Sequence, residues 1–305
     1  MSAPSPPPED HAPTPEDTSV DGGEVAPQKR GAIWRRLKRN RLSVAGLIVL
    51  SIVVLLAVLA PILPLADPAA TNTANRLARP GSEGHVLGAD HLGRDLLSRL
   101  IWGGRTSLSV GVFATLIAAT IGSLLGLVSG FFGGRTDNIL MRGVDVLMAF
   151  PYLLLAIALV AVLGPGLINA MIAISIVNIP FFARAVRGTT VGLVANEYVD
   201  AARALAFSRI RILFREVLPN VMPTIIITMS TTVGWMITET AGLSFLGLGA
   251  QPPTSDWGAM LGAGREFITR APHVMLVPGS MIFLVVISLN FLGDGLRDAL
   301  DPRLK

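Results

Sequence analysis

The chain has 305 residues, of which 51% are hydrophobic and only 15% are charged, and its mean hydropathy is +0.59. This composition excludes an ordinary soluble domain and indicates a protein that crosses a membrane several times. The absence of cysteine excludes disulfides, thiolate metal sites and cysteine nucleophiles. The net charge is +4, and the basic residues lie in short clusters between apolar runs. This pattern is typical of residues that orient a protein in a membrane and not of nucleic-acid binding, so we expect no nucleic-acid partner.

The N-terminal part divides into two segments. Residues 1–28 contain seven prolines and six acidic residues but no lysine or arginine, which predicts a disordered cytoplasmic tail. Residues 29–66 then combine a basic cluster with the first apolar stretch. Because Ile33, Trp34 and Leu37 lie among the basic residues, we expect a short helix on the membrane surface before the first span.

Six apolar segments are long enough to cross a bilayer, for which about 20 residues are needed. The predicted spans are Leu42–Leu63, Leu108–Phe131, Leu140–Leu163, Leu167–Arg184, Val221–Leu246 and Val274–Leu292. The fourth is the weakest, because it is short and contains Asn169, Asn178 and Pro180. Backbone polar groups must be satisfied inside the bilayer, so the expected fold class is an all-α membrane protein with six transmembrane helices.

The distribution of basic residues orients these spans. With the N-terminus in the cytoplasm, 18 lysines and arginines lie inside and seven outside, which is the bias found in membrane proteins. We therefore expect both termini in the cytoplasm, an external loop over residues 67–106, and a core of five spans over residues 107–305. A cytoplasmic loop over residues 185–219 interrupts this core.

The second predicted span contains small residues at every fourth position: Ala114, Ala118, Gly122, Gly126 and Gly130. Such a stripe lets two helix backbones approach closely. Ordinary helix packing is the expected role, and a mobile interface beside a pathway is the alternative.

The cytoplasmic loop reads NEYVDAARALAFSRIRILFREVLPN over residues 196–220. It is too charged to span a membrane, and the helical spacing of Tyr198, Ala201, Ala202 and Leu205 predicts a flat face rich in alanine. Such a face suits close contact with a partner backbone, whereas an amphipathic helix on the inner leaflet is the alternative.

This loop resembles the EAA coupling loop of ABC importer permeases. The resemblance rests on Asp200-Ala201-Ala202, on Ala206 at the position of a family glycine, and on Leu218-Pro219. Asp200 replaces the usual glutamate, and Glu216 stands where an aliphatic residue is typical. By resemblance the loop forms a short helix that docks on a cytoplasmic ATPase. The implied coupling residues are Tyr198, Asp200, Ala201, Ala202, Arg203, Leu205, Ala206, Leu218 and Pro219.

Three further stretches resemble the dipeptide and oligopeptide permeases of the DppC/OppC type. They read HVLGADHLGRDLLSRLIWGGRTSLSVG (85–111), ETAGLSFLGLGAQPPTSDWGAML (239–261) and GDGLRDALDPRL (293–304). The resemblance implies the type I ABC importer permease fold in a bacterial cytoplasmic membrane. It also implies a heterodimer with a homologous permease, two ABC ATPase subunits, an extracytoplasmic solute-binding protein and a peptide substrate, with the lipid bilayer around the spans.

The external loop contains Asp90, Arg94, Asp95 and Arg99, which we expect to form a local ion-pair network at the outer mouth. At an exposed surface such pairs contribute about 0–1 kcal/mol each. A metal site formed by His85, Asp90, His91 and Asp95 is the alternative, although the histidine spacing matches no recurrent ligand pattern.

Four polar residues within spans are candidates for the translocation pathway: Asn178, Thr238, Glu239 and Asn290. An ionisable residue such as Glu239 is costly in a membrane and is therefore a functional candidate. It either pairs with Arg184 or with another helix, or it attracts the amino terminus of a peptide. The hydroxyl groups of Thr238 and Thr240 can bond to their own helix backbone.

No phosphate-binding loop is present, since none of the three lysines lies in a GxxxxGK[ST] motif. We therefore expect a non-catalytic subunit without a bound cofactor, with ATP and magnesium on the partner ATPases. Nickel, glutathione and haem are alternative substrates of similar permeases. An ion-driven secondary transporter and an anchor subunit without a pathway are the other classes, but there is no convincing internal repeat that would favour an ion-driven transporter.

Overall fold

The computed structural model describes residues 40–300. The expected tail over residues 1–28 and the basic cluster before residue 40 therefore lie outside the described residues. Between residues 40 and 300 the chain is helical, and its only β-structure is two isolated bridges in the outer loop.

The helices follow one another with short connections, except for the long loop after the first. Their bounds are α2 (Arg41–Leu59), η1 (Thr73–Asn75), α3 (Leu96–Phe132), α4 (Gly134–Met148), α5 (Tyr152–Leu163), α6 (Leu167–Val194), α7 (Glu197–Ala204), α8 (Arg209–Ile212), the π-helical η2 (Leu213–Val217), α9 (Leu218–Phe245), α10 (Trp257–Gly264), η3 (Arg265–Phe267) and α11 (His273–Leu300).

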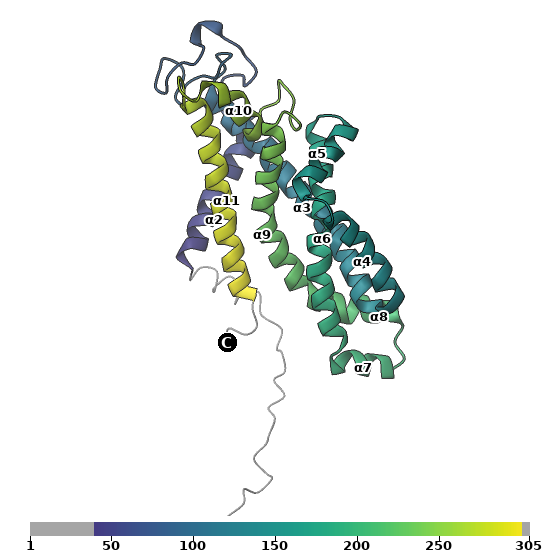
Figure 1. Ribbon diagram of the computed structural model, residues 1–305. Helices are drawn as coiled ribbons and strands as arrows, with labels where there is room; N and C mark the ends of the chain where they lie inside the picture. The colour runs from purple at the N-terminus through teal and green to yellow at the C-terminus, as the bar shows by residue number, and fades with distance from the viewer. Residues whose placement is uncertain (1–39, 301–305) are drawn as a thin grey trace, which may run out of the picture.

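Five helical segments are long and apolar enough to cross a membrane, and the bent pair α4–α5 makes a sixth when it is counted as one span. Figure 1 shows that α7 lies at one end of the molecule, together with the start of α2 and the end of α11. The outer loop and α10 lie at the opposite end. Both ends of the described chain are therefore on the side of α7, as an even number of crossings requires.

The third predicted span is not one helix. The expected segment Leu140–Leu163 breaks between Met148 and Tyr152, and α4 and α5 meet at 87°. Pro151 explains the break, because proline lacks the N–H of the helical ladder and disfavours helical dihedrals in the residue before it. A polar, charge-rich α4 and an apolar α5 therefore take different directions.

The fourth span is longer than predicted and tolerates its proline. Helix α6 extends ten residues beyond Arg184, to Val194, with Pro180 inside it. Asn169, which weakened the prediction, donates its amide hydrogens to the carbonyl oxygens of Leu163 and Gly164 at 2.9 and 3.0 Å. Its polar side chain therefore closes the turn between α5 and α6 and does not interrupt the span.

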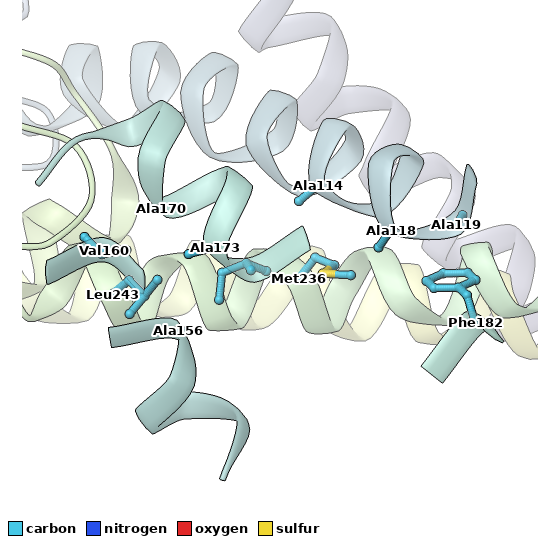
Figure 2. Close-up of a cluster of buried hydrophobic side chains, with 11 residues drawn as sticks. Ala114, Ala118, Ala119, Ala156, Val160, Ala170, Ala173, Phe182, Met236 and Leu243 are labelled. Atoms are coloured by element: carbon cyan, nitrogen blue, oxygen red, sulfur yellow. The ribbon is translucent and has the colours of Figure 1, made fainter. Parts of the chain in front are cut away.

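The predicted stripe of small residues is the contact between α3 and α6. A Cβ atom added at Gly122 would lie 2.6 Å from the carbonyl oxygen of Ile179, and one at Gly130 would lie 2.8 Å from the Cβ atom of Thr190. Ala114 and Ala118, further along the same stripe, belong to a cluster of buried side chains from α3, α5, α6 and α9 (Figure 2). The expected helix packing is thus confirmed.

Candidate functional site

The predicted coupling segment forms a separate unit at the end of the bundle. Helix α7 begins after Asn196 and is followed by the short helices α8 and η2, which continue into α9 (Figure 1). The segment is attached through a buried cluster in which Val199 and Ala202 pack with Ile212, Val217 and residues of the spanning helices. A movement of α7 would therefore act directly on α9 and α6.

The alanine-rich face of α7 is divided between the bundle and the solvent. Ala201 and Leu205 are exposed, the latter to 68%, and Tyr198 is partly exposed at 37%. Ala202 is only 6% exposed, because it turns inward beside Val199. The expectation that Ala202 shares an open docking face is therefore corrected: its position on the helix lies at the edge of the buried side.

Helix α7 ends in a left-handed turn at the position of the family glycine. Ala206 has a φ of 56°, its N–H bonds to the carbonyl of Arg203 at 2.9 Å, and the N–H of Phe207 bonds to that of Ala202 at 3.2 Å. This is the hydrogen-bond pattern of a Schellman motif, whose left-handed residue is usually glycine. Ala206 therefore terminates the helix in a conformation that is strained for alanine.

Leu218 and Pro219 lie where the cytoplasmic segment continues into the spanning helix α9. They are the first two residues of α9, which follows the π-helical η2 without a break. The expected cytoplasmic loop therefore ends inside a continuous helix and not at a helix boundary.

Within the bundle, Glu239 on α9 meets Asn178 on α6. The Nδ2 group of Asn178 donates to Oε2 of Glu239 at 2.9 Å, and Glu239 is 6% exposed. Its Oε1 atom has no hydrogen-bond partner among the described residues. The expected pairing with another helix is thus correct, but Arg184 is the wrong partner, since it binds Asp145 on α4 at 2.6 Å.

The other two pathway candidates are not joined to this pair. Thr238 is exposed and donates its hydroxyl to the carbonyl of Gly234 at 3.0 Å, as the sequence predicted for a threonine in a span. Asn290 is exposed on α11, a helix that packs on α2 and α9. The structure therefore brings together Asn178 and Glu239 only.

The outer-loop ion pairs exist, but they are buried. Asp90 accepts from Nε of Arg94 at 2.7 Å, and Nε of Arg99 lies 3.6 Å from the same carboxylate. Asp90 and Arg99 are each 4% exposed. The expectation of weak pairs at an exposed surface is therefore wrong, because removing one partner of a buried pair costs about 3–5 kcal/mol.

Asp95 and the two histidines complete this outer cluster. Asp95 caps α3 through the N–H of Ser98 at 2.8 Å and bonds Nδ1 of His85 at 3.0 Å. His91 instead stacks on Phe267 with ring centroids 5.7 Å apart, and burial lowers its pKa despite the neighbouring Asp90 carboxylate. Among residues 40–300 no three potential ligands are grouped so that they could hold a metal ion.

A second buried polar contact in the outer half was not predicted from the sequence. Asp256 accepts from the hydroxyl of Ser107 at 2.7 Å and caps α10 through the N–H of Ala259 at 3.0 Å. Trp257 is buried beside it and donates its indole N–H to the carbonyl of Leu100 at 2.8 Å. The capping signal, an aspartate before a helical run, was visible in the sequence, whereas its partner on α3 was not. The helix after Asp256 is thus packed against the bundle.

Comparison with known proteins places these features in one family. Residues 122–305 match the family model of the binding-protein-dependent transport system inner membrane component. Residues 31–80 match the N-terminal TM domain of oligopeptide transport permease C. These two matches include the coupling segment, both members of the Asn178–Glu239 pair and helix α2.

Several relatives are similar over nearly their whole length. The chain is 45% identical to the dipeptide transport system permease protein DppC of Alkalihalophilus pseudofirmus, covering 98% of this chain and 96% of that protein. It is 45% identical to the glutathione transport system permease protein GsiD of Pectobacterium atrosepticum, covering 89% and 90%. It is 42% identical to the di/tripeptide transport system permease protein DppC of Pseudomonas aeruginosa, covering 93% and 96%.

The fold is also found in a solved structure. An inward-facing conformation of the MetNI methionine ABC transporter superposes with a TM-score of 0.55 at 18% sequence identity, covering 67% of this chain and 96% of that chain. At this identity the likeness concerns the fold alone. The chain therefore belongs to the family of binding-protein-dependent transport system inner membrane components, and it is a multi-pass permease of the bacterial inner membrane with an ABC importer fold.

Proposed function

We propose that this chain is the translocation-pathway subunit of an ATP-driven importer of di- or oligopeptides, and that α7 couples it to a separate ATPase. The observation that carries the coupling role is the position of α7. Its exposed residues Tyr198, Ala201 and Leu205 face away from the bundle, while Val199 and Ala202 anchor it to the spanning helices. A partner that moves α7 therefore moves the ends of α6 and α9.

The proposed assembly follows from what this family does. The chain pairs with a homologous permease, two ATPase subunits bind ATP and magnesium at the cytoplasmic end, and an extracytoplasmic binding protein delivers the substrate. Because the sequence has no phosphate-binding loop, this subunit is proposed to be non-catalytic. Relatives named for dipeptides and for glutathione are similarly close, so glutathione, itself a small peptide, is the second candidate substrate.

The pathway is proposed to pass the polar positions Asn178, Thr238, Glu239 and Asn290. Support comes from the cost of burying a carboxylate in a membrane span and from the Oε1 atom of Glu239, which no described residue satisfies. Thr238 and Asn290 are exposed in the single chain, so a partner permease or a substrate has access to them.

The coupling role is tested with arginine at Ala201, because this exposed position leaves the internal packing intact. In the complete transporter reconstituted in vesicles, Ala201→Arg is expected to release the ATPase subunits or to separate ATP hydrolysis from uptake of a labelled dipeptide. Ala201→Ser, which keeps the small size, should retain both activities. Uptake of labelled glutathione in the same vesicles distinguishes the two candidate substrates.

Arginine at Ala202 is the less informative variant, since it also disturbs the buried cluster around Val199. The proposal fails if the chain binds no ATPase subunit and uptake survives both Ala201→Arg and the depletion of ATP. An ion-driven carrier would then be the better explanation.

A further inference from the structure

A cavity lies between the end of α3 and the end of α7 with the segment that follows it. Its volume is about 380 Å³, and its lining residues are Phe131, Phe132, Arg203, Phe207, Arg209 and Ile212. Phe131 and Phe132 are the last residues of the spanning helix α3. The cavity is therefore at the level where the apolar part of the bundle ends on the side of α7.

The chemistry of this cavity is both apolar and cationic. Three phenylalanine rings and Ile212 form its apolar part, two guanidinium groups form its polar part, and no acidic residue of the described chain lines it. Arg203 pairs with Asp200 at 2.8 Å. Between residues 40 and 300, no acidic side chain forms a salt bridge with Arg209.

A third guanidinium group adds to the positive charge nearby. The Cζ atom of Arg211 lies 4.0 Å from the centroid of the Phe207 ring. This cation–π contact holds Phe207 and Arg211 together at the edge of the cavity.

The cavity adjoins α7 but does not include its proposed docking residues. Arg203 of α7 lines the cavity, but the exposed residues Tyr198, Ala201 and Leu205 do not. Phe132 is 41% exposed at the end of α3, so the apolar part of the cavity is accessible from outside the single chain.

We propose that this cavity binds the phosphate headgroup of an anionic phospholipid from the inner leaflet. Arginine binds phosphate through paired N–H donors, and basic pockets at the cytoplasmic ends of spanning helices suit anionic headgroups. The rings of Phe131 and Phe132 contact the glycerol and first methylene groups, while Arg209 binds the phosphate. This site does not depend on which substrate the transporter carries.

The test uses the complete transporter, extracted from vesicles of phosphatidylcholine with an equal amount of phosphatidylglycerol, and measures the lipids that it retains by native mass spectrometry. Phosphatidylglycerol should be retained in preference to phosphatidylcholine. Arg209→Gln should weaken this retention about fivefold, the effect of one basic residue at a membrane surface. Thermal unfolding in parallel verifies that the exposed Arg209 side chain is not needed for folding.

Arg215→Gln is the matched control, because Arg215 is exposed on the same segment but does not line the cavity. The proposal is overturned if both variants lose retention equally, which would indicate diffuse attraction to the membrane surface. It is also overturned if soluble glycerol phosphate displaces the lipid at equal concentration, or if the lipid binds only after the ATPase subunits are removed. Because no transport is measured, these outcomes are independent of the proposed peptide import.

Discussion

Ala206 adopts a left-handed conformation that residues other than glycine, asparagine and aspartate rarely take. Its Cβ atom crowds the neighbouring carbonyl in that conformation, at a cost of roughly 1 kcal/mol. The Schellman hydrogen bonds around it and the packing of Ala202 hold the turn in place. The resemblance at the sequence level marked this residue as a departure from the family, and the backbone explains why the family uses glycine there.

Ala206→Gly should therefore stabilise the turn after α7 by about 1 kcal/mol, since glycine has no Cβ atom to clash. Hydrogen exchange of the backbone amides over residues 197–207 measures this local stability, and slower exchange is expected. Ala204→Gly is the control, because the same replacement inside the exposed helix lacks this relief and should accelerate exchange. Faster exchange in Ala206→Gly would contradict the strained turn.

At the scale of helices, α3 and α6 approach each other closely along the stripe of small residues. Glycines of α3 lie directly against the backbone of α6, so that even a methyl group at Gly122 would meet the Ile179 carbonyl oxygen. This contact supports the predicted coupling segment, because α6 leads into α7 and residues of α3, α6 and α7 belong to the cluster around Val199. The spacing of small residues predicted the packing, whereas the identity of the partner helix required the structure.

Gly122→Leu should destabilise the detergent-solubilised transporter by about 3 kcal/mol or more, because the backbone of α6 cannot yield to a large side chain. Gly188→Leu is the matched control: Gly188 lies in α6, and a Cβ atom there meets nothing within 4 Å. Leucine favours a helix more than glycine does, so this variant should be neutral or slightly stabilising. The thermal unfolding temperatures of both variants are compared with that of the unchanged transporter. An equal loss of stability in both would show that the α3–α6 contact is not tight.

At the scale of the whole molecule, two patterns bear on the orientation in the membrane. The basic residues predict both termini in the cytoplasm, and the described ends of the chain lie on the same side as α7. We therefore expect the outer loop to be external, at the end that would face the proposed binding protein. The lack of native cysteine allows this orientation to be tested with single thiols.

Glu83→Cys, in the outer loop, should react with a membrane-impermeant maleimide added to intact cells, because Glu83 is exposed in a loop that we expect on the external side. Ala201→Cys, on α7, should react only after the membrane and the complex are dissolved in a denaturing detergent. Labelling of both variants in that detergent controls for the reactivity of each thiol. The opposite pattern in intact cells would invert the proposed topology.

The sequence alone was sufficient for the class of protein, for most of the spanning segments and for the position of helix α7, whose coupling role stays a prediction. Long apolar runs, the stripe of small residues at every fourth position and the Asp200-Ala201-Ala202 motif are local patterns. Such patterns can be recognised without knowing which helices are neighbours in the fold. Pro151 was also a sequence signal for the break between α4 and α5, but the apolar residues around it favoured the prediction of a single span.

Only the tertiary structure decided which side chains meet. The burial of Ala202, the choice of Asn178 rather than Arg184 for Glu239, and the burial of Asp90 with Arg99 depend on helices that are distant in the sequence. Helical periodicity says which residues share a face but not what covers that face. That is decided by how the helices pack, because contact requires surfaces that fit and polar groups that find partners.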